Sequence, residues 1–146
     1  MTITSSAFKP NESIPPRYTC DGENISPALE FFEVPENTQS LALIVDDPDA
    51  PAGTWTHWIV WNINPGIKQI TEGATPLGAT EGTTSFGKPG YGGPCPPSGQ
   101  HRYVFKLYAL DTVLDLKPSA NVAALQSALS SHTIGQAQLM GRYRRQ

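Results

Sequence analysis

The chain has 146 residues, which suits a single domain, residues 1–146, around one hydrophobic core. Hydrophobic residues make up 38% and charged residues 16% of the sequence, and the net charge is −3. This balance excludes a disordered acidic chain and argues against a nucleic-acid-binding protein, which needs clustered Lys and Arg. The longest apolar stretches are far shorter than the roughly 20 residues that span a bilayer, so no stable membrane insertion is expected.

The first ten residues lack the basic start and apolar run of a secretory signal peptide, so a cytoplasmic location is expected. In a reducing cytosol the two cysteines, Cys20 and Cys95, are expected to be free thiols. They form no CxxC motif and no zinc-like spacing. The sequence does not show whether they lie close together. A thiol at Cys95 would be reactive if it lay beside a protonated histidine.

Three apolar runs rich in β-branched and aromatic residues predict buried strands, at residues 40–46, 56–63 and 103–110. Continuous apolar runs of this kind are typical of strands that are covered on both faces. Between the second and third runs lies a long segment rich in Gly and Pro, residues 73–99. Long irregular loops in compact domains are often functional.

The last third of the chain predicts one short helix followed by a strand. Ser119 is a candidate N-cap, and Val122, Leu125 and Leu129 share one face at helical spacing. From Gln136 onward, apolar or small residues alternate with polar ones at period two, which indicates a strand with one buried face. The sequence therefore predicts a mainly β fold with several strands in two sheets and one short helix before the C-terminal strand.

Three short stretches place ionisable side chains at predicted strand ends. The segment 46–51 (DDPDAP) ends the first run, His57 opens the second, and the segment 99–103 (GQHRY) opens the third. A carboxylate bonded to an imidazole fixes its tautomer and favours its charged form, so an Asp with two His could build an anion site. Arg102 is expected to form an ion pair with a carboxylate of the acidic turn. A purely structural role for each group, as an acidic turn or a packed histidine, remains an alternative.

Other chemistries fit the sequence less well. No G-x-S-x-G serine elbow is present, and a near match to a phosphate-binding P-loop at residues 82–89 has Pro89 where Ser or Thr must bind Mg²⁺. Two histidines and a carboxylate could hold a divalent metal, but no metal or cofactor is predicted. An Asp–His pair could act as a general base on a phosphoester, yet no nucleophile supports an enzyme.

These stretches together resemble the phosphatidylethanolamine-binding protein family, also called the Raf kinase inhibitor-like proteins. The resemblance runs from Thr19 to about Arg144. It rests on five motifs in order: residues 19–27 (TCDGENISP), 47–51 (DPDAP), 56–62 (THWIVWN), 93–103 (GPCPPSGQHRY) and 139–143 (LMGRY). The form of the fourth motif and the compact length are similar to the bacterial and archaeal branch.

The resemblance implies a β-sandwich of two antiparallel sheets. It also implies a small surface pocket for phosphate, phosphoethanolamine-like or other small anions. Its ligand-binding residues would be Asp47, His57 and His101, with Gly93, Pro94 and Cys95 as a wall and Tyr103 lining or supporting the site. Gly92 and Gly93 are expected to let the backbone approach the anion. Eukaryotic relatives continue into a C-terminal helix near this pocket, whereas the sequence stops at Gln146. The pocket is therefore expected to be more open, or to be completed by a second subunit in a homodimer.

Two functions follow as expectations. The first is a binding protein for a small phosphorylated ligand, with a regulatory role and no catalysis. The alternative, as in some relatives, is an inhibitor of a kinase or a serine protease that acts through an exposed loop within residues 73–99 (GATPLGATEGTTSFGKPGYGGPCPPSG).

Overall fold

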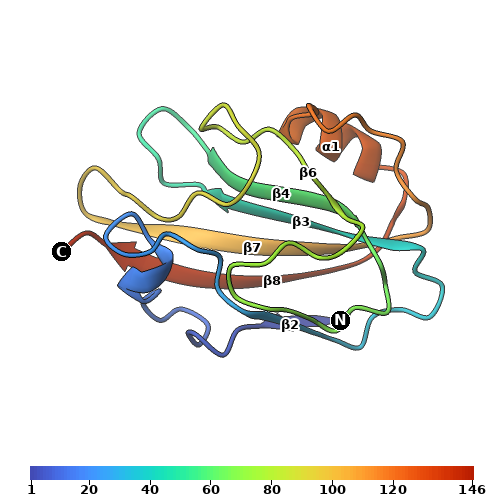
Figure 1. Ribbon diagram of the computed structural model, residues 1–146, viewed down its shortest axis with the longest axis horizontal. Coiled ribbons are helices and arrows are strands. Elements are labelled where there is room, and N and C mark those ends of the chain that lie inside the picture. The colour runs from blue at the N-terminus through green and yellow to red at the C-terminus, as the bar shows by residue number, and fades with distance from the viewer.

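The computed structural model describes residues 1–146, which form two antiparallel sheets and one α-helix (Figure 1). The five-stranded sheet has the order β6 (Thr80–Glu81), β4 (Trp55–Ile63), β3 (Ser40–Asp47), β7 (Gln100–Leu110) and β8 (Thr133–Arg144). The three-stranded sheet has the order β1 (Thr2–Thr4), β2 (Leu29–Phe32) and β5 (Gln69–Ile70). A 3-10 turn spans Pro16–Tyr18, and helix α1 spans Val122–Leu129. The predicted β-sandwich with one short helix before the last strand is confirmed.

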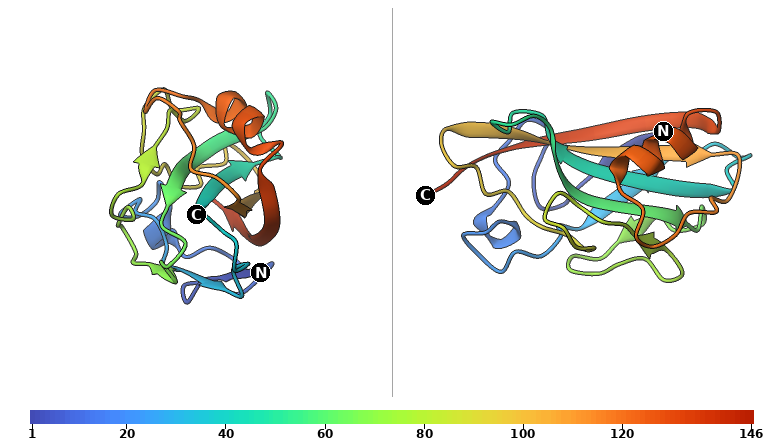
Figure 2. Two further views of the ribbon diagram at one scale, coloured as in Figure 1. Left: turned by 90° about the vertical axis from the view of Figure 1, so that its right-hand side faces the viewer. Right: turned by 90° about the horizontal axis from the view of Figure 1, so that it is seen from above.

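The central strands are apolar on both faces because each face of the five-stranded sheet has a cover. Side chains at odd positions of β3, such as Leu43 and Val45, join the core between the two sheets. Even positions, such as Ala42 and Ile44, pack under α1 with Trp61 of β4. The two views of Figure 2 show α1 lying over the outer face of this sheet. The continuous apolar run at residues 40–46 thus reflects two separate cores.

The N-cap of helix α1 lies two residues later than predicted. The Ala124 N–H donates to Asn121 Oδ1 over 3.0 Å, so Asn121 and not Ser119 is the N-cap. The Ser119 carbonyl instead accepts a hydrogen bond from Thr83 Oγ1 at 3.1 Å. Leu125 and Leu129 are buried against the sheet, as their spacing predicted. No helix of the chain has both the length and the apolar character needed to cross a membrane.

Strand β8 extends further toward the N-terminus than its alternating pattern indicated. It starts at Thr133 and pairs with β7 along its whole length, with Leu139 opposite Phe105 and Tyr143 opposite His101. Leu139 and Tyr143 are buried and their neighbours in sequence are more exposed, which confirms the period of two. The strands β1, β2, β5 and β6 were not predicted, because two to four residues are too few for a pattern to be visible.

Candidate functional site

The three ionisable stretches meet at one end of the five-stranded sheet. In the antiparallel order β4-β3-β7, the last residue of β3 lies beside the first residues of β4 and β7. Asp47 ends β3, His57 is the third residue of β4, and His101 is the second residue of β7. The loops that follow β3 and precede β7 gather at this end, on the left of Figure 1.

A cavity of about 250 Å³ opens between these strand ends. Five of the predicted ligand-binding residues line it, and six further residues complete its wall: Asp47, His57, Cys95, His101 and Tyr103, with Ala50, Pro51, Trp55, Phe86, Pro96 and Pro97. No Lys or Arg side chain lines the cavity. An anion held there would therefore rely on imidazole, hydroxyl and backbone donors.

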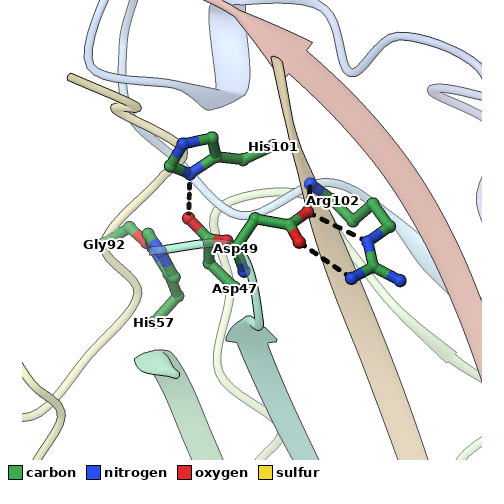
Figure 3. A network of polar contacts seen from close by, with 6 residues as sticks. All are labelled: Asp47, Asp49, His57, Gly92, His101 and Arg102. Carbon is green, nitrogen blue, oxygen red and sulfur yellow. Dashed lines mark hydrogen bonds and ion pairs between the residues drawn. The ribbon is translucent and has the colours of Figure 1, made fainter. Parts of the chain in front are cut away.

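Asp47 and His101 form a buried pair at the base of the cavity (Figure 3). His101 Nδ1 lies 2.7 Å from Asp47 Oδ2, and the exposed fractions of the two residues are 7% and 3%. The other oxygen, Asp47 Oδ1, accepts the N–H of Asp49 at 2.8 Å, which closes the turn after β3. Since a carboxylate oxygen accepts the Nδ1 proton, the ring is held in one orientation and its Nε2 has no protein partner.

His57 is held by a backbone carbonyl on the other side of the cavity. Its Nδ1 donates to the Gly92 oxygen at 2.7 Å, and the Gly92 N–H donates back to the His57 carbonyl oxygen at 3.0 Å. Burial lowers the pKa of His57 below its usual value, against the opposing effect of the Gly92 carbonyl and the negative charges of Asp47 and Asp46. His57 is therefore neutral at pH 7 when no anion is bound. The sequence alone did not predict this charge state.

Tyr103 supplies a buried hydroxyl that lies near the Asp47 carboxylate and the Cys95 backbone without forming a well-aligned hydrogen bond to either. The residue is 1% exposed, and its Oη is one of two buried side-chain polar atoms in the chain without a hydrogen bond. Its ring meets the His57 ring edge to face, with 5.3 Å between centroids, and stacks with His101 at 6.5 Å. Burial and the Asp47 charge raise the pKa of the Tyr103 hydroxyl, so it keeps its proton. Unpaired buried polar atoms are rare and costly, so the hydroxyl is a feature of the cavity that the packing of the protein leaves incompletely satisfied.

The predicted ion pair of Arg102 is confirmed, and its partner is Asp49. The guanidinium binds both carboxylate oxygens, at 2.9 Å from Nε and 2.8 Å from the terminal nitrogen, and the Arg102 backbone N–H adds a third bond. These bonds lower the pKa of Asp49 to about 2. The pair lies outside the cavity and ties the turn after β3 to the start of β7 (Figure 3).

An apolar rim surrounds the polar base of the cavity. Trp55 and Phe86 meet edge to face with 5.5 Å between ring centroids, and Phe86 lies 5.4 Å from the ring of His57. Phe86 is placed by its neighbour Ser85, which exchanges two hydrogen bonds with the backbone of Thr56. Trp55 stands two residues before His57, and period two in a strand predicts that both share a face. No signal in the sequence indicated Phe86, because it lies in the irregular Gly/Pro-rich segment.

The prediction that both cysteines are free thiols was wrong, because Cys20 and Cys95 form a disulfide. The residues are 75 positions apart, but the fold brings the loop after the 3-10 turn against the segment 91–97, with 5.5 Å between the two Cα atoms. Cys95 lines the cavity, whereas Cys20 does not. Since a disulfide sulfur does not ionise, Cys95 is not a thiolate nucleophile in this state.

Gly93 and Pro94 are buried and do not line the cavity. A Cβ at Gly93 would collide with the carbonyl oxygen of Tyr18 and with Asn24 Oδ1, which accepts the Gly93 N–H at 2.8 Å. The glycine is therefore needed for close contact between two protein segments. The approach of an anion to this backbone stays a prediction, and the atoms that lie against Gly93 belong to the protein.

The fold and the site define a small β-sandwich protein with one histidine-containing cavity at the end of its larger sheet. A family model described as phosphatidylethanolamine-binding protein matches residues 4–144. A protein of Methanothermobacter thermautotrophicus, designated a UPF0098 protein, is 51% identical, with 99% of both chains covered. A UPF0098 protein of Chlamydia pneumoniae is 48% identical, with 98% of both chains covered.

Two solved structures have the same fold. A putative phosphatidylethanolamine-binding protein homologue from Chlamydia trachomatis matches with a TM-score of 0.96 and 43% identity, over 99% of this chain and 97% of that one. YbcL of E. coli, described as a member of the mammalian PEBP family, matches with a TM-score of 0.93 and 34% identity, over 99% and 98%. The chain belongs to the phosphatidylethanolamine-binding protein family.

Proposed function

We propose that the cavity binds the anionic head group of a small phosphorylated ligand, such as phosphate or a phosphoethanolamine-like group, and that the protein has a regulatory role. The observation that carries the proposal is the convergence of His57 and His101 on one cavity, each with an Nε2 atom that forms no hydrogen bond within the protein, beside the hydroxyl of Tyr103. Both histidines use Nδ1 inside the protein, so Nε2 is free and donates to an anion when the ring is protonated. The buried Tyr103 hydroxyl adds a neutral donor.

The same geometry favours binding over catalysis. Neither histidine is hydrogen-bonded to a Ser, Thr or Cys side chain, as an activated nucleophile would require. Cys95, the one cysteine in the cavity, is held in the disulfide. No group of three or more His, Cys, Asp or Glu side chains is arranged to hold a metal ion. We therefore propose a binding protein and not an enzyme.

A calorimetric titration tests the head-group proposal with three probes: inorganic phosphate, phosphoethanolamine and ethanolamine. We expect the first two to bind saturably and ethanolamine not to bind, because the cavity is proposed to recognise the anion. His57→Ala and Asp47→Ala are each expected to weaken phosphate binding at least about tenfold, since each removes a donor or the group that orients one.

His132→Gln is the matched control, because His132 pairs with Asp111 on the surface beyond the opposite end of β7. It should bind phosphate like the unchanged protein. Equal binding of ethanolamine and phosphate, or full binding by both cavity variants, would reject the head-group proposal.

A second candidate function, inhibition of a serine protease, is favoured by one specific observation. Leu77 is 94% exposed, between Pro76 and Gly78 in the Gly/Pro-rich segment. A large apolar side chain on an exposed loop suits insertion into the specificity pocket of a chymotrypsin-like protease. We expect Leu77→Asp to weaken inhibition of chymotrypsin at least about tenfold, while His57→Ala leaves it intact. Absence of inhibition by the unchanged protein would remove this candidate.

A further inference from the structure

The disulfide joins the ligand cavity to a separate loop, and its two sulfurs are in unequal surroundings. Cys95 is exposed and lines the cavity beside Pro96 and Pro97. Cys20 is half-buried and lies outside the cavity lining. An incoming molecule that enters the cavity mouth therefore meets Cys95 first. Exposed disulfides are the ones that exchange with external thiols, and access decides which sulfur is attacked.

The two joined segments have further contacts that do not depend on the sulfurs. The Cys20 N–H donates to the Pro94 oxygen at 3.1 Å, and the Tyr91 hydroxyl donates to the Tyr18 oxygen at 2.7 Å. The Gly93 N–H to Asn24 bond is a third link. Because none of these bonds involves a sulfur atom, we expect the cavity wall to keep its place when the S–S bond opens. Opening the disulfide then changes only the group that is bonded to the Cys95 sulfur.

We propose that the Cys20–Cys95 disulfide is an exchange site for low-molecular-weight thiols at the mouth of the cavity. The thiolate of the incoming molecule attacks Cys95 Sγ and forms a mixed disulfide there. The bond between Cys20 and Cys95 breaks, and Cys20 Sγ leaves as a thiolate that takes a proton from water. One disulfide replaces another, so no separate oxidant is needed. When Cys20 is deprotonated again, it attacks Cys95 Sγ, releases the thiol and restores the first state.

The mixed disulfide has a consequence for ligand binding that rests on the proposed function. The group attached to Cys95 lies in the wall of a cavity of about 250 Å³, which also contains His57 and His101. Glutathione, a tripeptide thiol, attached to Cys95 is expected to occupy this space and to exclude a phosphorylated head group. The concentration of low-molecular-weight thiol would thus control access to the cavity, because it sets how much mixed disulfide forms at Cys95.

The exchange itself is tested with glutathione on the oxidised protein, followed by alkylation of free thiols and peptide mass mapping. We expect glutathione on Cys95 and the alkyl label on Cys20, in at least about tenfold excess over the reverse arrangement. Glutathione mainly on Cys20, equal distribution, or no adduct would overturn the proposal. So would a purified protein whose two cysteines are both free thiols under oxidising conditions.

The effect on the cavity is measured by phosphate titration of Cys20→Ser, loaded at Cys95 with oxidised glutathione so that Cys20 cannot reverse the adduct. Loading is expected to weaken binding at least about tenfold relative to the same variant unloaded. Loading Cys20 in Cys95→Ser is the matched control and should change its affinity less than about twofold, because Cys20 lies outside the cavity. Equal loss in both overturns the coupling. If the unmodified protein binds no phosphate, the proposed function fails, and the mass map alone decides the exchange site.

Discussion

Replacing both cysteines by serine is expected to lower the free energy of unfolding by roughly 4 kcal/mol, the largest stability effect we predict. The disulfide joins residues 75 positions apart, and a cross-link over so long a segment removes many conformations from the unfolded chain. The measurement is urea unfolding of the oxidised protein and the Cys20→Ser/Cys95→Ser variant, followed by tryptophan fluorescence.

The unchanged protein unfolded in the presence of a reductant is the control. It should unfold at the urea concentration found for the double variant, since both lack the cross-link while the reduced protein keeps its cysteines. An oxidised protein no more stable than the double variant would show that the disulfide contributes nothing to the folded state.

Anion binding is expected to weaken strongly as pH rises from 6 to 8. Burial lowers the pKa of His57, so the ring is neutral in the empty cavity at pH 7. A bound anion stabilises the imidazolium and raises that pKa, so the complex takes up a proton between the two values. Affinity therefore rises as pH falls through the pKa of the complex and levels off below the lowered pKa of the empty site, with a slope of up to about tenfold per pH unit.

Sulfate is the suitable probe, because it does not titrate in this range and any pH dependence belongs to the protein. We expect the dissociation constant to rise at least about tenfold between pH 6 and pH 8. His57→Gln should remove most of this dependence, and His132→Gln, which alters a surface histidine, should keep it. A flat profile in the unchanged protein, or an unaltered slope in His57→Gln, would contradict the account.

The sequence predicted the elements that are long enough to show a period. The apolar runs at β3, β4 and β7 and the alternation in β8 identified the central sheet, because a covered strand and a half-covered strand leave different patterns. The edge strands β1, β5 and β6 left no such pattern, since they have only two or three residues. Their positions follow from contacts with strands far away in the sequence.

The residues of the candidate site also fall into those that the sequence predicted and those that it did not. Asp47, His57 and His101 were identifiable because strand ends in an antiparallel sheet bring polar residues together beside loops. Phe86 was not, because an irregular loop has no period that predicts where a side chain points. The charge of His57 was equally out of reach, since it depends on how deeply the ring is buried and not on which residues surround it in the chain.

The sequence by itself determined the main strands, the single helix and the three ionisable groups at the strand ends, because these depend on local pattern. Only the tertiary structure decided that Cys20 meets Cys95, that Gly93 serves close packing and that Tyr103 keeps an unpaired hydroxyl. Each of these depends on contacts between segments tens of residues apart. Such contacts are set by the packing of the whole chain, which no short stretch of sequence contains.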